Sequence, residues 1–137
     1  MTAGYSKKSL VEKLGIKDGA TVSIINSPDN YKKTLGLLPS RVKKSSKLQT
    51  NSDFIQFFTR SKEELKSKFP ILKKSLTKNG ILWISWPKGV SRIVTDLNEN
   101  IVREIGLENG LVDIKVCAVD EIWSGLKFVF RIKDRAK

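Results

Sequence analysis

Hydrophobic positions between residues 81 and 130 alternate between short apolar runs and a helical spacing. Ile81–Trp86 is a continuous apolar run bounded by a glycine and a proline, as expected of a strand buried on both faces. From Leu97 to Leu107 the apolar residues recur at helical spacing. Two further runs, 112–119 and 126–132, predict strands joined by a short loop. This part of the chain therefore predicts a strand, a helix and a closing pair of strands.

The first 80 residues predict a second series of strands and helices. These are a helix over 6–14, a strand over 21–26, a helix over 31–38, a lysine-rich edge strand over 41–48, a strand over 53–59 and a helix over 61–76. In the last helix, Ser61 with Glu64 three residues later has the spacing of a capping box. Pro70 is expected to kink or split that helix, because proline has no N–H to donate. Thr95 or Asp96 is expected to cap the helix over 97–107.

The alternation of strands and helices indicates one α/β domain over residues 1–137. Helices between successive strands favour parallel strands that are covered on both faces. Right-handed crossovers leave very few topologies for such a chain. The last two strands have no helix between them, so we expect them to be antiparallel. The predicted fold class is an open three-layer sheet, mostly parallel, with a C-terminal antiparallel hairpin.

Composition excludes several classes of site. The chain has no histidine, which excludes Ser-His-Asp and Cys-His nucleophilic sites and most catalytic zinc sites. The single cysteine, Cys117, excludes an internal disulfide and is interpreted as a small buried side chain. No apolar run approaches the roughly 20 residues of a membrane span, and no apolar segment of a secretory signal is visible near the N-terminus. A cytoplasmic protein without membrane contact is expected.

Positive charge is concentrated in the first 80 residues. They hold 17 Lys and Arg against 6 Asp and Glu, and the whole chain has a net charge of +12. Such an excess attracts nucleic acid or another polyanion by counterion release. However, the cations are 20 Lys and only 6 Arg, whereas base recognition relies on Arg, and they are spread over several predicted elements. Polyanion binding is therefore an alternative and not the favoured function.

The predicted arrangement resembles the Rossmann-like methyltransferase fold. The segments GILWISWPK and VDIKVCAVDEIWSGLKFVFR are similar to the late strands of that fold. The resemblance implies the strand order 2-1-3-4-6-5, with strand 6 reversed. Over nearly its whole length the chain also resembles a family of short bacterial proteins, domain of unknown function 3052. That resemblance rests on GYSKKSLVEKLGIKDG, ILWISWPK and GLVDIKVCAVDEIWSGLKFV, and it implies the fold without a reaction.

Two features of methyltransferases are missing from the sequence. Their first strand runs into a glycine-rich turn, and their second strand ends in an acidic residue that binds the ribose of the cofactor. Here the first strand continues as SIINSPDNYKK, which has no GxG, and Pro28 removes a backbone N–H. The second strand ends KSSKLQTN, without an acid. The sequence therefore predicts no cofactor and no metal.

Ligands of open α/β sheets bind beyond the carboxyl ends of the parallel strands. This rule gathers the polar and indole side chains after the first, fourth and fifth strands, namely Asn26, Ser27, Asp29, Trp86, Lys88, Asp120, Glu121 and Trp123. Such a set suits a small polar ligand or a peptide, and no catalytic residue is predicted. In the alternative interpretation the indoles cover the end of the sheet and Lys88 neutralises Asp120 and Glu121. Trp83 is expected in the core, on the opposite face of its strand from Trp86.

These patterns favour a non-catalytic α/β domain that binds a small ligand or a protein partner at this border of the sheet. The lack of histidine and of a glycine-rich loop argues against an enzyme. The first alternative is a diverged methyltransferase-like enzyme that depends on S-adenosylmethionine. The second is a module that binds nucleic acid or another polyanion.

Overall fold

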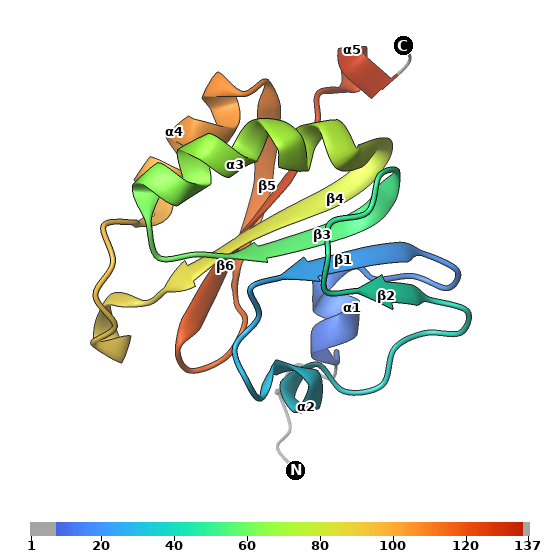
Figure 1. Ribbon diagram of the computed structural model, residues 1–137, viewed down its shortest axis with the longest axis horizontal. Helices are drawn as coiled ribbons and strands as arrows, with labels where there is room; N and C mark the ends of the chain where they lie inside the picture. Colours follow the sequence, from blue (N-terminus) through green and yellow to red (C-terminus); the bar gives the residue numbers. More distant parts are fainter. Residues whose placement is uncertain (1–7, 136–137) are drawn as a thin grey trace.

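The structure, a computed structural model, describes residues 8–135. Six strands form one sheet in the order β2-β1-β3-β4-β6-β5, with helices on both faces (Figure 1). The strands are β1 Thr21–Ile25, β2 Lys43–Ser45, β3 Ser52–Phe58, β4 Leu76–Pro87, β5 Leu111–Ala118 and β6 Trp123–Phe130. The helices are α1 Leu10–Leu14, α2 Tyr31–Leu35, α3 Lys62–Ser75, α4 Glu99–Glu108 and α5 Ile132–Arg135, with a 3₁₀ turn at Gly89–Ser91. The predicted fold class and strand order are confirmed.

The direction of each strand determines where a ligand can bind. Strands β1 to β4 are parallel, and β6 is antiparallel to both β4 and β5, as the sequence predicted. The chain passes from β1 outward to the edge strand β2, then returns to β3 on the other side of β1. The topological switch point therefore lies between the carboxyl ends of β1 and β3, which is where open α/β sheets bind ligands.

Two hydrophobic cores lie on opposite faces of the sheet. Helices α3 and α4 cover one face, and α1 and α2 cover the other (Figure 1). Trp83 is 0% exposed in the core under α1 and α2, and Trp86 is 5% exposed in the core under α3 and α4. The indole N–H of Trp83 donates to the carbonyl of Leu14 at 2.8 Å. The predictions that Trp83 is a core residue and that the two indoles point to opposite faces are confirmed.

Helix α3 differs from its prediction at both ends and in the middle. It continues through Pro70 as a single helix. Pro70 and Lys66, the residue whose carbonyl loses its helical partner, are both exposed, so water can replace the missing hydrogen bond. Ser61 caps the helix, accepting from the N–H of Glu64 at 3.1 Å, but the Glu64 carboxylate accepts from Thr59 instead of returning a bond to Ser61. Only half of the predicted capping box therefore forms.

Strand β4 starts where α3 ends, at Leu76, and not after the predicted turn at Asn79 and Gly80. These two residues lie in an irregular stretch of the strand, between the pairs Ser52–Leu76 and Phe54–Ile81. A bulge of this kind inserts extra residues without ending the strand. The Asn-Gly pair therefore marks a bulge within β4.

Several other boundaries differ from the predictions. Asn98 caps α4 by accepting from the N–H of Ile101 at 2.9 Å, so the predicted caps Thr95 and Asp96 are wrong. Asp96 instead accepts from the N–H of Lys62 at the start of α3, at 2.7 Å. Strand β6 begins at Trp123, three residues before the predicted start, and the predicted end of that strand is helix α5. The elements α2 and β2 are shorter than predicted, and β2 lies at the sheet edge as expected.

The N-terminal helix is also shorter within the described residues. It begins at Leu10 after Ser9, which forms a complete capping box with Glu12; the predicted start at residue 6 lies outside the described part of the chain. Between residues 8 and 135, no helix combines the length and the apolar character needed to cross a membrane.

Candidate functional site

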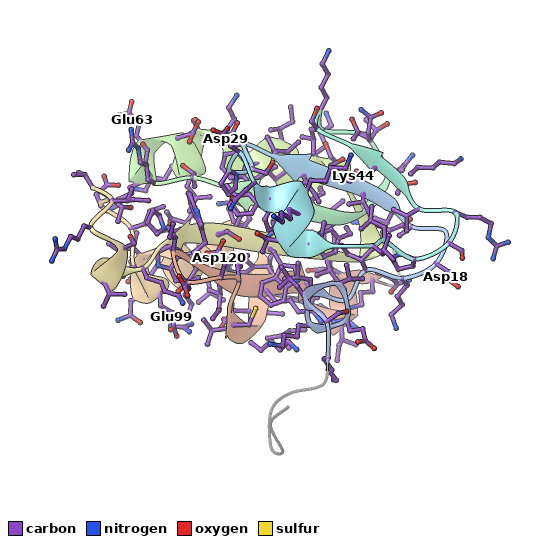
Figure 2. All side chains as sticks on the ribbon, turned by 90° about the horizontal axis from the view of Figure 1, so that it is seen from below. Asp18, Asp29, Lys44, Glu63, Glu99 and Asp120 are labelled. Atoms are coloured by element: carbon purple, nitrogen blue, oxygen red, sulfur yellow. The ribbon has the colours of Figure 1, made fainter. Side chains whose placement is uncertain are left out.

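The carboxyl ends of the five mutually parallel strands lie along one border of the sheet, here called the carboxyl border. Strand β6 runs the other way, so its first residue, Trp123, is at this border and pairs with Pro87 at the end of β4. The strand directions thus place the segments after Ile25, Ser85 and Val119 on the same border, as the sequence suggested. Asp29 and Asp120 reach it from two different loops, the β1–α2 turn and the β5–β6 turn (Figure 2).

Lys88 and Asp120 hold the β5–β6 turn against the end of β4. The Lys88 ammonium donates to the backbone carbonyl of Asp120 at 2.6 Å, and the backbone N–H of Lys88 donates to the carbonyl of Ile122 at 2.7 Å. One carboxylate oxygen of Asp120 accepts from the N–H groups of Ile122 and Trp123, both at 2.8 Å. The lysine therefore binds a carbonyl and not the predicted carboxylates, and both side chains serve the local structure.

Trp123 joins an aromatic cluster under the β5–β6 turn. Its ring meets Phe58 edge to face with centroids 5.1 Å apart, and Phe58 meets Tyr31 in the same way at 4.8 Å. Beside this cluster is a cavity of about 230 Å³, the turn cavity, lined by Pro28, Asn30, Thr34, Asp120, Glu121, Ile122 and Trp123. It brings three of the predicted site residues together.

The other predicted site residues do not join this cavity. Trp86 is buried in the core under α3 and α4, because β4 is covered on both faces as far as Pro87, so its indole does not line the turn cavity. Ser27 and Asp29 are exposed on the β1–α2 turn. Asn26 lines a different cavity at the switch point. The predicted residues are therefore divided among several places, which are the turn cavity, the switch-point cavity, the core under α3 and α4, and the exposed surface.

The second cavity, the switch-point cavity, lies between β1, β3 and α3 and has a volume of about 350 Å³. Its walls are Ile25, Asn26, Leu48, Phe57, Glu64, Lys68, Ile71 and Leu72. Except for Asn26, these residues are absent from the predicted site, because that site contains only residues that follow the first, fourth and fifth strands. The predicted strand order could have found the place, since the order reverses between strands 1 and 3.

The switch-point cavity combines a carboxylate, an ammonium group and an apolar floor. Glu64 is half-buried and accepts from the hydroxyl of Thr59 at 2.5 Å. Lys68 lies one helical turn further along α3 and is exposed. Phe57 and Leu72 are both 2% exposed and form the dry side. This arrangement suits a small ligand that carries both polar groups and an apolar part.

A buried chain of polar side chains runs beneath the carboxyl border. The Tyr31 hydroxyl donates to Gln56 at 2.6 Å, and the Gln56 amide donates to the hydroxyl of Ser85 at 3.1 Å. Burial raises the pKa of Tyr31, which the hydrogen bond with Gln56 opposes more weakly. The phenol therefore stays protonated at neutral pH and serves as a donor.

Neither a reactive thiol nor a metal centre lies in the described chain. Cys117 is half-buried, less than predicted, and burial raises the pKa of its thiol, so it stays protonated and weakly nucleophilic. Among residues 8–135 no three His, Cys, Asp or Glu side chains are grouped so that they could hold a metal ion.

No protein-family model and no curated protein matches the chain, so the resemblance to domain of unknown function 3052 is not confirmed. Solved structures of methyltransferases are similar to it. Magnesium protoporphyrin IX methyltransferase from Synechocystis PCC 6803 has a TM-score of 0.57 at 12% identity, over 89% of this chain and 78% of that chain. A TehB-like SAM-dependent methyltransferase from Corynebacterium glutamicum gives 0.56 at 11% identity, over 94% and 91%. A SAM-dependent methyltransferase from Aquifex aeolicus gives 0.55 at 17%, over 87% and 86%.

At these identities the similarity shows the fold, which is a methyltransferase-like Rossmann fold. It also corrects the interpretation as a non-catalytic binding domain. These three solved structures are methyltransferases, so they favour the enzyme alternative over that interpretation.

The residues around β1 and β2 do not reproduce the usual contacts of such proteins with S-adenosylmethionine. The turn after β1 reaches the left-handed region at Asn26, with φ of 60°, and not at a glycine. It continues through Pro28, which has no N–H, into a helix of only five residues. Strand β2 is followed by Ser46 and Lys47, where the fold usually has an acid. The chain therefore has the strand order of this fold, whereas the residues that usually contact the cofactor in such proteins are missing.

Proposed function

We propose that this protein is a methyltransferase-like enzyme that binds its substrate at the switch-point cavity. One observation carries the proposal: the cavity lies at the reversal of strand order and contains the half-buried carboxylate of Glu64. Ligands of open α/β sheets bind at that position, and the solved structures of similar fold are methyltransferases.

The residues of the cavity suggest separate roles. Glu64 is placed to accept a hydrogen bond or a proton from a bound hydroxyl or amine, with Thr59 fixing its orientation at 2.5 Å. Lys68 offers a positive charge to an anionic group at the mouth of the cavity. Phe57 and Leu72 exclude water from the inner wall, which strengthens polar contacts there.

S-adenosylmethionine is the first cofactor to test. The Synechocystis methyltransferase of similar fold was solved with S-adenosylmethionine and with SAH. Because the glycine turn and the ribose-binding acid are missing here, any binding of this cofactor has to use other contacts. Glu64 is the carboxylate that lines the cavity.

Binding can be tested by calorimetry and thermal unfolding with S-adenosylmethionine and S-adenosylhomocysteine. At a hundredfold excess over the dissociation constant, binding adds about 2.7 kcal/mol to the free energy of unfolding, a shift of several degrees in melting temperature. We expect Ile71→Trp to abolish this shift by filling the cavity, since Ile71 is 54% exposed and lines its wall. Leu37→Trp is the matched control, because Leu37 is 95% exposed and is not a wall residue.

Glu64→Gln tests the role of the carboxylate separately from the role of the cavity as the binding site. It keeps the size of the side chain and removes its charge, so we expect ligand affinity or turnover to fall about tenfold or more, with little change in folding. If neither compound shifts the melting temperature of the unmodified protein at millimolar concentration, the cofactor assignment is wrong. If Ile71→Trp and Leu37→Trp behave alike, the cavity is not the site.

A further inference from the structure

A basic pocket lies on the border of the sheet opposite to the carboxyl border. It is formed by the end of α3, the start of β4 and the β2–β3 loop, and its volume is about 540 Å³. This pocket, here called the lysine pocket, is lined by Asn51, Pro70, Lys73, Lys74, Leu76, Thr77 and Lys78. Three of these seven residues are cations and none is an acid.

Two of the lysines are held in place by one buried ring. The ammonium groups of Lys73 and Lys78 lie 5.9 and 4.5 Å from the centroid of Phe130. Lys73 also donates to the carbonyl of Asn109, at the end of α4, at 2.7 Å. Arg135 of α5 donates to the carbonyl of Phe130 at 2.9 Å. Cations from α3, β4 and α5 thus gather around Phe130. The contacts of Lys73 and Lys78 restrict their side chains, which lowers the entropy lost on binding an anion.

The nearby acids do not balance this charge. Asp53 is linked to the pocket through the hydroxyl of Thr77, at 3.5 Å, and its other oxygen accepts from the N–H of Thr21. In the sequence of α5, Asp134 is flanked by Lys133 and Arg135. The end of helix α3 contributes the equivalent of only about half a negative charge. A positive excess therefore remains at the pocket.

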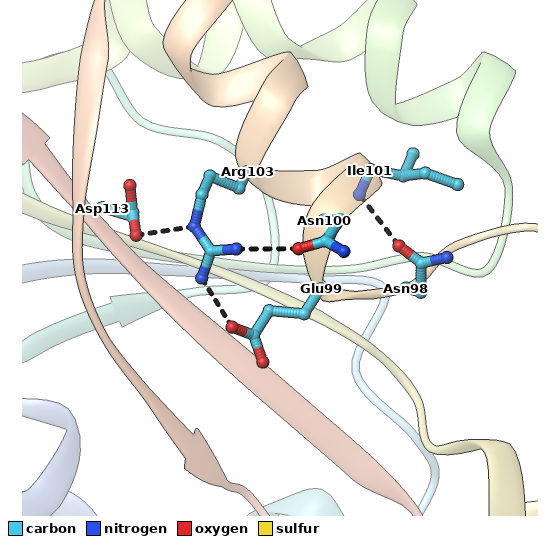
Figure 3. A network of polar contacts seen from close by, with 6 residues as sticks. All are labelled: Asn98, Glu99, Asn100, Ile101, Arg103 and Asp113. Carbon is cyan, nitrogen blue, oxygen red and sulfur yellow. Dashed lines mark hydrogen bonds and ion pairs between the residues drawn. The ribbon is translucent and has the colours of Figure 1, made fainter.

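The contrast with Arg103 shows what a locally balanced cation looks like in this protein. Its guanidinium binds Glu99 and Asp113, at 2.5 and 2.9 Å, and also the side chain of Asn100 (Figure 3). These are the ion pairs that the structure gives within residues 8–135. Lys73 and Lys78 are instead held by a carbonyl and an aromatic ring, which leaves their charge available to an anion from solution.

We propose that the lysine pocket binds the phosphodiester backbone of a single-stranded nucleic acid. Lysine ammonium groups bind phosphate as point charges, and a concave pocket admits one strand better than the convex surface of a duplex. The apolar atoms of Leu76 and Pro70 offer a surface for sugar or base. Phe130 is only 3% exposed, so it is not available for stacking, and binding is independent of base sequence.

The test is fluorescence anisotropy with labelled single-stranded oligonucleotides of about 20 nucleotides, between 50 and 200 mM NaCl. Lys74 and Lys78 are both exposed, so the double variant Lys74→Glu with Lys78→Glu should fold. We expect it to bind about tenfold or more weakly, and the slope of log affinity against log salt to become shallower by about 1.4, from roughly 0.7 per phosphate contact. The matched control, Lys32→Glu with Lys33→Glu, makes the same change of net charge on exposed residues of α2.

The control separates a local site from general attraction to a positively charged protein. If both double variants bound the oligonucleotide equally weakly, the lysine pocket would not be its binding site. The absence of oligonucleotide binding at 50 mM salt would also overturn the proposal. Binding of inorganic triphosphate without binding of the oligonucleotide would mean that the pocket binds a small phosphate compound, and it would overturn the proposal of single-stranded nucleic acid. None of these results depends on the switch-point cavity, so this proposal and the proposed enzyme can fail separately.

Discussion

At the scale of single residues, the buried polar groups are satisfied. Within residues 8–135, every buried side-chain nitrogen and oxygen has a hydrogen-bond partner. Gln56, which is 0% exposed, accepts from Tyr31 and donates to Ser85. Since a buried polar atom without a partner costs about 1–3 kcal/mol, each member of this chain depends on the others.

Tyr31→Phe tests this chain through its pH dependence. At pH 8 we expect the free energy of unfolding to fall by about 1–3 kcal/mol, because the side-chain oxygen of Gln56 loses its donor. Burial raises the pKa of Tyr31 in the folded protein, whereas the unfolded chain ionises near pH 10. The stability that Tyr31 provides is therefore complete below about pH 10 and is lost above it, as the unfolded state releases the proton.

The variant has no phenol to ionise, so the stability gap between the two proteins should narrow from about pH 9.5 to 11.5. Urea unfolding of both proteins across this range measures the gap. A gap that stays constant would mean that Tyr31 ionises equally in the folded and unfolded chains.

Gly106 is the second residue for which the structure predicts the effect of a substitution on stability. It is buried in α4, and a Cβ atom there would lie 2.0 Å from the ring of Phe128. Gly106→Ala gains up to about 1 kcal/mol of helix propensity, but overpacking costs about 1–3 kcal/mol or more. We expect a net decrease in stability, measured by urea unfolding. Gly89→Ala is the control, since nothing lies within 4 Å of its added carbon.

At the scale of elements, Pro70 leaves α3 intact at a cost. Within a helix proline is roughly 3 kcal/mol less favourable than alanine, partly offset because proline also restricts the unfolded chain by about 1 kcal/mol. Pro70→Ala should therefore raise the free energy of unfolding by about 1–2 kcal/mol. The neighbouring change Ser67→Ala, on the exposed side of the same helix, should stay within about 0.5 kcal/mol. A decrease in stability for Pro70→Ala would mean that the ring packs usefully at the lysine pocket.

The element boundaries show where sequence reasoning stops. The apolar pattern predicted the strands other than the lysine-rich β2, and the helices α1, α3 and α4, because buried faces impose their period locally. The cap of α4 was misplaced, since Thr95, Asp96 and Asn98 are all good capping residues. Only the packing of α3 beside Asp96 decides between them, through the bond from the N–H of Lys62. The turn predicted at Asn79 and Gly80 was wrong for a similar reason, because the same residue types favour a turn and a bulge.

At the scale of the whole molecule, the strand order, the carboxyl border and the switch point were predictable, and the residues that line the cavities were not. The order followed from the resemblance, and the parallel direction of the strands followed from the alternation of elements. The walls of the switch-point cavity come from β1, β3, the β2–β3 loop and α3, so they depend on how these elements pack. For the same reason the sequence left Trp86 either as a ligand-binding residue of the border or as cover for the end of the sheet, and the packing of the helices buries it in the core under α3 and α4.

The placement of β6 between β4 and β5 has a consequence for synthesis on the ribosome. Strand β4 is almost wholly buried from Leu82 to Pro87, yet one of its two neighbours is made only when residues 123–130 have emerged. Until then the nascent chain presents a long apolar strand with open hydrogen-bonding groups on one side. Vectorial folding from the N-terminus can therefore build β1 to β3 early, but the centre of the sheet closes late and is the segment for chaperones to protect.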